Sequence, residues 1–424
     1  MRRDSILLED RSGLRYLRFL EGRKSNYQIV RIIEKKRIFA PIMNRNIIKL
    51  ILLPAFVTML SMHAVASNND SICAKGFWTN IQVSVRGDYG FFVHHHLEMT
   101  RFGKHFPTFE IAMQKKTYGN DAWQSYFNYP TFGVAFFYSP LGNTDIIGQS
   151  VAVYPFVTFH FLKSEKNQLN FRFGGGLGYL TKKYDRYDNY QNTSIGSHVT
   201  AAFNIGLEYS RVIAKRYTIG LHAGLVHFSN GSTRVPNNGL NFITAGINAT
   251  YLLQDEPEKD IPRPEKIGHP YSGWRKDLWS YYLSMQISAK DIDQYRGYGR
   301  NWAVYDLSGN VMKRVSFLSK VGVGINVVYD DTDKRILEDE GETFNDAELI
   351  KLGIAASYEI MFGSTSVLVN VGGHVTGKRR ADGVLYEKVM LKQNITKHTF
   401  GALSLTFHGC VADYIGYGIG FRIN

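Results

Sequence analysis

Apolar and polar residues alternate along most of this chain, in segments of roughly 9–15 residues separated by turn-rich stretches. Such alternation predicts β-strands with one apolar face, because successive side chains of a strand point to opposite faces. Sixteen strands are predicted on this basis. They lie at residues 76–86, 106–116, 130–138, 148–162, 168–181, 196–211, 216–229 and 239–253 and, after a polar break at 254–275, at 276–290, 300–315, 318–330, 347–361, 364–376, 383–394, 397–409 and 412–423.

The two faces of these strands differ in a way that indicates their surroundings. In residues 216–229 the odd positions include Ile219 and Leu221, whereas the even positions include Gly220 and His222. A soluble β-sandwich or soluble barrel would also alternate, but an apolar face opposite a small, polar one is typical of a lipid-facing exterior around a polar lumen. The sequence therefore predicts an all-β, transmembrane, up-and-down antiparallel barrel of about 16 strands, with an eight-stranded barrel plus a second β module as the alternative.

The connections between the strands support a barrel of the bacterial outer membrane. Short turns such as 363–364 alternate with longer loops such as 87–105, 182–195 and 331–346, as in barrels with short periplasmic turns and long outer loops. The last strand, near 414–421, resembles the C-terminal signals that barrel-insertion machinery reads, although the chain ends without the usual terminal aromatic residue.

A secretory signal peptide is predicted at residues 43–66. Arg45 and Lys49 form its basic segment, an apolar run from Leu50 to Met62 follows, and Ala64-Val65-Ala66 is the cleavage signal. A membrane anchor is the alternative, but this apolar run is too short to span a bilayer. We therefore interpret residues 1–42 as a spurious N-terminal extension and residues 67–424 as the mature integral outer-membrane protein.

Charge and cysteine content add little to this picture. The net charge is +13, but residues 1–66 carry +8 of it, so the basic balance does not indicate nucleic-acid binding. Cys73 and Cys410 fall at opposite ends of the predicted barrel, which predicts that they are unpaired.

The strongest candidate for chemistry is the pair His227 and Ser229. Two residues apart in a strand, their side chains share one face, and an imidazole there can take the proton of a serine hydroxyl. Both continue the apolar, lipid-facing row of 216–229, where polar side chains cost free energy unless they have a function. The alternative is an interfacial His beside a loop Ser without chemistry.

Residues 227–231 read His-Phe-Ser-Asn-Gly, and residues 236–241 read Pro-Asn-Asn-Gly-Leu-Asn. These two motifs resemble the signature of the lipid A 3-O-deacylases (PagL), often described as acyloxyacyl hydrolases, and the resemblance extends over 76–254. It implies that His227 is the general base and Ser229 the nucleophile. It also implies that Asn230 and Asn237 are oxyanion donors.

The chain departs from this family at Asn241. The family has a Glu that orients the His at this position, twelve residues after the Ser. An Asn can still accept a hydrogen bond from an imidazole N–H, but it cannot stabilise the imidazolium with a full charge. Residues 276–424 also lie beyond the resemblance, and we expect them to complete one larger barrel rather than form a second module.

The sequence thus predicts a serine esterase that removes an acyl chain from lipid A or lipopolysaccharide of the outer leaflet, without a cofactor. The alternatives are a non-catalytic porin or transport barrel that retains the deacylase scaffold, and an adhesin. His94-His95-His96 and the acidic stretch 338–347 are weaker candidates for metal or Ca²⁺ binding. The acyl position, the openness of the lumen and the oligomeric state stay open.

Overall fold

The computed structural model describes residues 5–9, 15–19, 80–93, 97–117, 119, 121–164, 166–253, 278–379, 383–409 and 411–423. Residues 1–56 and 57–424 are separate compact units. In the first, β1 (Ser5–Glu9) pairs with β2 (Arg15–Phe19) as an antiparallel hairpin. The residues predicted to form the signal peptide, Cys73, Cys410 and His94 to His96 all lie outside the described residues.

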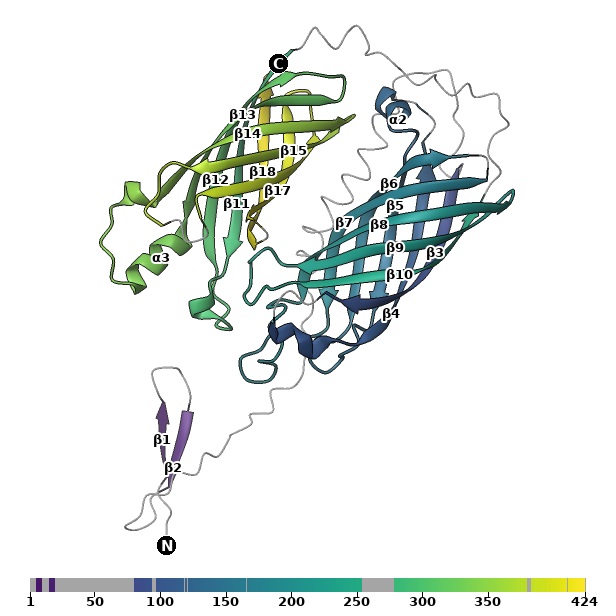
Figure 1. Cartoon of the computed structure of the whole chain (residues 1–424). Coiled ribbons are helices and arrows are strands. Elements are labelled where there is room, and N and C mark those ends of the chain that lie inside the picture. Colours follow the sequence, from purple (N-terminus) through teal and green to yellow (C-terminus); the bar gives the residue numbers. More distant parts are fainter. Residues whose placement is uncertain are drawn as a thin grey trace. The chain divides into compact units, whose positions relative to one another are not determined.

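The N-terminal barrel is a closed antiparallel meander of eight strands (Figure 1). Its strands are β3 (Ile81–Phe92), β4 (His105–Lys116), β5 (Thr131–Ser139), β6 (Ser150–Lys163), β7 (Asn167–Leu180), β8 (Val199–Ala214), β9 (Tyr217–Ser229) and β10 (Leu240–Leu252). The connections contain η2 (Leu97–Phe102) and α2 (Ala122–Tyr126). The barrel closes where β10 pairs with β3, from Phe242 opposite Phe92 to Leu252 opposite Gln82.

The C-terminal barrel closes in the same way, with β11 paired to β18. Its strands are β11 (Trp279–Lys290), β12 (Trp302–Arg314), β13 (Ser319–Asp330), β14 (Ile350–Phe362), β15 (Thr365–His374), β16 (Leu385–Asn394), β17 (Thr399–His408) and β18 (Val411–Ile423). Its loops contain η4 (Asp293–Tyr295), α3 (Asp331–Asp339) and η5 (Asp346–Leu349). Asp330 caps α3 by accepting a hydrogen bond from the Thr332 backbone at 2.9 Å.

The prediction of sixteen barrel strands is confirmed, but the expectation that they form one barrel is wrong. They close as two barrels of eight, which is the alternative arrangement. The reason is that alternation along a strand is local and is the same in a barrel of eight or of sixteen, whereas closure depends on which strands pair. The polar break in the sequence follows β10, which is the strand that closes the first barrel by pairing with β3.

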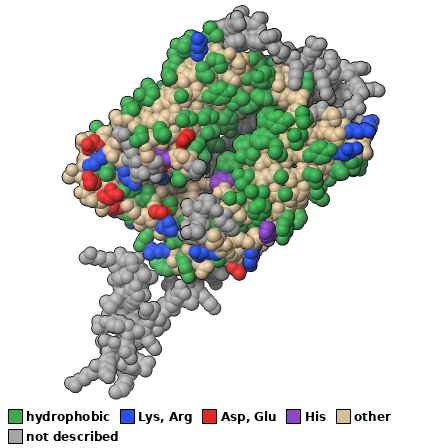
Figure 2. All heavy atoms as spheres, in the orientation of Figure 1, with side chains coloured by type: hydrophobic (Ala, Val, Ile, Leu, Met, Phe, Trp, Pro, Cys, Tyr) green, Lys and Arg blue, Asp and Glu red, His purple; other side chains and the backbone are tan. Residues whose placement is uncertain are grey.

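Both barrels have an apolar exterior. Along β9 the outward side chains of Ile219 and Leu221 are 47% and 61% exposed, whereas the inward His222 is 3% exposed. Figure 2 shows hydrophobic side chains spread over the outer surface of the strands. The assignment of odd positions in 216–229 to the outward face is therefore confirmed.

Charged side chains fill the interior of the N-terminal barrel at mid-height. Glu110 accepts from Arg86 Nη2 at 2.6 Å and from Arg172 Nη1 at 2.8 Å, and all three side chains are at most 5% exposed. Tyr154 donates its hydroxyl to the same carboxylate. Because each charge has an opposite charge beside it, part of the desolvation cost of burial is offset.

The C-terminal barrel is filled by a different network. Lys388 Nζ lies 2.5 Å from Asp306 Oδ2, and Tyr414 donates to the same oxygen at 2.7 Å. The side chains of Lys388 and Asp306 are 0% and 2% exposed. Lys392 pairs in the same way with Glu359, at 2.8 Å. Side chains, rather than open solvent, therefore occupy this part of the lumen, as expected for eight strands.

The two ends of each barrel differ. Most of the longer connections, such as 93–104, 181–198, 230–239 and 331–349, join strands at one end of each barrel, which we call the long-loop end; the connection that contains α2, between β4 and β5, lies at the other end. Short connections such as 215–216 and 363–364 lie at the other end, where β3 begins and β18 ends. Gly363 occupies one of these tight turns with a positive φ of 68°.

The ion pair of the C-terminal interior can be tested by removing its cation. Lys388→Met leaves the Asp306 carboxylate buried without its positive partner, so we expect a loss of about 3–5 kcal/mol in the free energy of unfolding. The measurement is the temperature at which the electrophoretic band of the folded barrel disappears and is replaced by the band of the unfolded chain. Lys388→Met/Asp306→Asn should recover most of the loss, and an unchanged transition in Lys388→Met would contradict the proposed role of the pair.

Candidate functional site

The predicted site residues come from the long-loop end of β9 and the facing start of β10. Pairing of these strands places His227 directly opposite Asn241. Both belong to outward rows, because their neighbours Phe228 and Phe242 are fully buried in the barrel interior. Ser229 lies two residues after His227 on the same outward row of β9. The outward orientation predicted from the alternation is therefore correct for all three side chains.

Asn241 holds the imidazole of His227. Asn241 Oδ1 lies 2.5 Å from His227 Nδ1, and a carbonyl oxygen can only accept. The proton of the neutral imidazole therefore resides on Nδ1. In this tautomer Nε2 carries the lone pair of the imidazole and is the nitrogen that can accept a proton.

Two neighbours limit how the imidazole can turn. The ring of Phe203, on β8, lies nearly parallel to that of His227 at a centroid distance of 6.2 Å. On the loop before β10, Gly239 has a positive φ of 74°, and a Cβ at this position would lie 3.0 Å from His227 Cε1. Glycine is therefore favoured here, both by the left-handed backbone conformation and by the limited space beside the ring.

Ser229 is surrounded by polar groups of the loop that follows β9, and its hydroxyl lies 3.3 Å from Asn237 Oδ1, to which it can donate. Its Oγ accepts from Asn237 Nδ2 at 3.0 Å and from the backbone N–H of Gly231 at 3.2 Å. It is only 8% exposed, although it belongs to an outward row. The loop 230–239 that follows β9 therefore covers the hydroxyl and brings amide donors to it.

Asn230 organises this loop. Its backbone N–H donates to Asn237 Oδ1 at 3.0 Å, which directs the Asn237 amide nitrogen towards Ser229. Its side-chain nitrogen donates to Arg234 O at 2.8 Å and to Ser197 Oγ at 3.0 Å. Asn230 is therefore engaged in holding the loop, whereas Asn237 presents an N–H beside the serine.

The structure thus brings the five predicted site residues into one cluster at the long-loop end of the N-terminal barrel. The cluster contains a base with an assigned tautomer, a hydroxyl on the same row and amide donors next to that hydroxyl. This combination can support attack of the hydroxyl on a carbonyl carbon, because the negative oxygen that forms needs nearby donors.

Sequence reasoning did not single out Ser197, Phe203 or Gly239 for this site. The position of Phe203 beside His227 depends on the pairing of β8 with β9. Gly239 carried a usable signal, because a glycine that follows two asparagines before a strand is typical of a left-handed turn residue.

The weaker candidates have other surroundings. In the acidic stretch, Glu338 and Asp339 contact Arg335, and Glu342 contacts Lys378. Within the described ranges, no three His, Cys, Asp or Glu side chains gather in an arrangement that could hold a metal ion. Among the same residues, no helix has the length and apolar character to cross a membrane.

An outward groove of about 590 Å³ lies elsewhere on the N-terminal barrel. It is lined mainly by apolar side chains, among them Phe109, Ile219 and Leu221. Leu221 precedes Ser229 by eight residues, which is about 27 Å along a strand. The groove is therefore remote from the cluster around the serine.

Comparisons with known proteins identify related families for both barrels. Residues 108–250 match the family described as "Lipid A 3-O-deacylase (PagL)", and residues 279–424 match "Acyloxyacyl hydrolase, C-terminal domain". No curated protein matches the chain.

Two solved structures are also similar to this chain over part of its length. The crystal structure of the outer membrane enzyme PagL is 15% identical, with 41% of this chain and 99% of that chain covered and a TM-score of 0.27. A mutant of Rh. blastica porin is 10% identical over 81% of this chain and 99% of that one, with a TM-score of 0.17. With such low TM-scores, neither likeness bears on function. The two family matches together span more than half of the chain, one on each barrel, and the chain belongs to the PagL and acyloxyacyl hydrolase family.

Proposed function

We propose that this chain is an outer-membrane serine esterase that removes an ester-linked acyl chain from lipid A or a related membrane lipid. The observation that carries the proposal is the cluster at the end of β9. There Asn241 Oδ1 holds His227 Nδ1 at 2.5 Å, and Asn237 Nδ2 donates to Ser229 Oγ at 3.0 Å. Membership of the PagL family supports the same chemistry.

The proposed location is the outer membrane, after removal of a signal peptide and insertion by the barrel-insertion machinery. The exposed apolar rows of both barrels favour a lipid environment, since such surface costs free energy in water. If β3 begins and β18 ends on the periplasmic side, the long-loop ends face outwards. Ser229 then lies near the outer-leaflet head groups, where acyl esters of lipid A are found.

We propose the following reaction sequence. His227 Nε2 takes the proton of Ser229 Oγ while this oxygen attacks the ester carbonyl carbon. Asn237 Nδ2 donates to the resulting oxyanion. The carbon–oxygen bond to the lipid then breaks, His227 returns the proton to the departing hydroxyl, and the acyl group stays on Ser229. Water, deprotonated by His227, releases the fatty acid and restores the serine.

The roles of the two loop asparagines differ in this scheme. Asn237 is the proposed oxyanion donor, because its amide nitrogen points at the serine oxygen. Asn230 is proposed to position Asn237 through its own backbone N–H, since its side chain is engaged with Arg234 and Ser197. The reaction needs no cofactor.

The alternative function, a porin or transport barrel, finds less support in the interior of the barrels. Salt bridges and hydrogen-bonded side chains occupy the described lumen of each one. An eight-stranded barrel is just wide enough for its side chains to fill, whereas aqueous channels need about 16 strands in one barrel.

The first prediction concerns the nucleophile. Ser229→Ala removes the attacking oxygen, so release of free fatty acid from lipopolysaccharide should fall to background. Mass spectrometry of lipid A before and after incubation is the measurement, and unchanged heat-modifiable mobility is the control for folding. If wild type releases no fatty acid, or if Ser229→Ala releases as much, the esterase proposal is refuted.

The second prediction concerns Asn241. Asn241→Leu removes the acceptor that fixes the His227 tautomer, so we expect kcat to fall by roughly tenfold or more. Asn241→Glu keeps an acceptor and adds a negative charge that stabilises the imidazolium, so its kcat should equal or exceed that of wild type. Both variants are assayed by fatty-acid release, and complete loss of activity in Asn241→Glu would assign Asn241 a different role.

The third prediction separates the esterase from the channel. Because side chains fill both lumens, purified protein in planar bilayers should give no stable single-channel conductance. A large porin of 16 strands serves as the positive control. Reproducible channel openings by the wild-type protein would favour the transport function instead.

A further inference from the structure

The loop 230–239, which supplies the donors around Ser229, also contacts the C-terminal barrel. Residues 57–424 form one compact unit, so these contacts lie within it. The C-terminal residues involved come from the start of β18 and from the loop 291–301 between β11 and β12.

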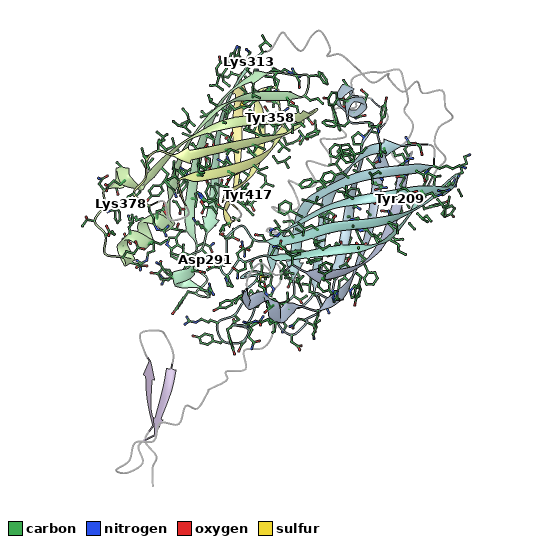
Figure 3. All side chains as sticks on the ribbon, in the orientation of Figure 1. Tyr209, Asp291, Lys313, Tyr358, Lys378 and Tyr417 are labelled. Carbon is green, nitrogen blue, oxygen red and sulfur yellow. The ribbon has the colours of Figure 1, made fainter. Side chains whose placement is uncertain are left out.

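Asp291 makes the central contact, and Figure 3 labels this residue. Its backbone N–H donates to Ser232 O at 2.9 Å, and its Oδ2 accepts from the backbone N–H of Val235 at 3.3 Å. Asp291 is only 2% exposed, and burial raises the pKa of its carboxyl above the usual range. It therefore satisfies two backbone groups of the loop in a site shielded from water.

Three further hydrogen bonds surround this contact. Ser232 Oγ donates to Ala412 O at 2.6 Å. Asn301 Nδ2 donates to Thr233 O at 2.8 Å. Arg234 Nη1 donates to Arg300 O at 2.7 Å. Each residue from 232 to 235 thus has at least one polar group bonded to the C-terminal barrel.

Close packing accompanies the hydrogen bonds at Gly231. A Cβ built on Gly231 would lie 2.3 Å from Ile415 Cγ1, which is closer than real side-chain atoms approach. Ile415 is only partly exposed, whereas Tyr417 and Ile419, farther along β18, are 56% and 60% exposed. The loop therefore covers Ile415. It can approach this closely because Gly231 has no side chain.

The barrels also meet away from this loop. The Phe362 ring, at the end of β14, lies 6.1 Å from that of Trp123 on α2 and 5.3 Å from that of Phe127. This aromatic contact is at the short-turn end, whereas Asp291 is at the long-loop end. Two contacts at opposite ends limit rotation of one barrel against the other.

We propose that the C-terminal barrel is a positioning element for the active site, with Asp291 and Ile415 fixing the loop that presents Asn237 to Ser229. This inference rests on the proposed esterase function and gives the second barrel a part in it. The physical reason is that this loop has two consecutive residues with positive φ, Gly231 and Ser232, and no secondary structure of its own. Without other support, such a loop would adopt several conformations, and the Asn237 side chain would have no fixed position. The hydrogen bonds from the C-terminal barrel restrict the loop and so hold this donor beside Ser229.

The first experiment measures the loop itself. Hydrogen–deuterium exchange of the full chain in detergent is followed for peptides that cover 230–239. Asp291→Ala should increase exchange in these peptides, because Val235 loses its acceptor. Asp293→Ala is the matched control, since Asp293 is in the same loop but pairs with Arg296. Equal exchange in Asp291→Ala and wild type would overturn the proposal, whether or not the protein is an esterase.

The second experiment tests whether the contact affects catalysis. Gly231→Ala places a methyl group against Ile415 and should lower kcat by about 10- to 100-fold with a smaller change in KM, as expected when reacting groups are displaced. Adding Ile415→Ala removes the atoms that collide. In a double-mutant cycle, the kcat of the double variant should therefore be at least about threefold higher than that of Gly231→Ala.

The outcomes separate the two proposals. If Gly231→Ala/Ile415→Ala is as impaired as Gly231→Ala, the defect lies in the left-handed backbone alone, and the positioning role of the C-terminal barrel is refuted. If wild type and all variants release no fatty acid while exchange still rises in Asp291→Ala, the esterase proposal fails and the loop contact stands. Ile415→Ala alone is measured to complete the cycle.

Discussion

Closure of the hydrogen-bond ladder at eight strands is the constraint on which the rest of this structure depends. Pairing of β10 with β3, and of β18 with β11, leaves neither barrel with an open strand edge. It also sets the diameter, and with eight strands the interior accommodates little beyond its own side chains. Arg86, Glu110 and Arg172 fill this space in one barrel, and Lys388 and Asp306 do so in the other. A substrate as large as a lipid therefore has no room inside, and chemistry on it must take place on the outer surface.

The candidate site lies on the outer surface of the N-terminal barrel. The outward rows of β9 and β10 are apolar until they reach His227, Ser229 and Asn241 at the long-loop end. A loop then bends back over the serine, so that the hydroxyl is shielded although it belongs to an exposed row. Shielding strengthens each hydrogen bond in the cluster, because the local dielectric is lower than that of water. The fold thus provides a shielded polar site on the outer face of a barrel whose described interior is occupied by side chains.

Local features of this fold were predictable from sequence, and features that depend on pairing were not. Alternation located every barrel strand, yet the first was placed at 76–86 instead of Ile81–Phe92, because Gly87-Asp88 resembles a turn although it lies within β3. The shared face of His227 and Ser229 follows from their spacing alone. The number of barrels could not be read in this way, since it depends on partners far apart in the chain. The same holds for Phe203 and Asp291, whose contacts with the site come from strand register and from the second barrel.

In the proposed esterase, Asn241 orients His227 without a negative charge. The short contact with His227 Nδ1 selects the tautomer, and this selection needs only an acceptor in the correct place. What a carboxylate adds is attraction to the imidazolium that forms when the serine loses its proton, and this attraction is largest where water is excluded. If the proposed site lies at the level of lipid head groups, phosphate charges and water contribute to the field as well, so a neutral partner of the imidazole loses less there than it would in a dry protein core. In the proposed reaction, order within the loop 230–239 then matters more, because the donors near Ser229 would stabilise the oxyanion with less help from the base. We therefore link two features of the proposed site: the hydrogen bonds that the C-terminal barrel makes to the loop 230–239, and the uncharged partner of His227 at position 241.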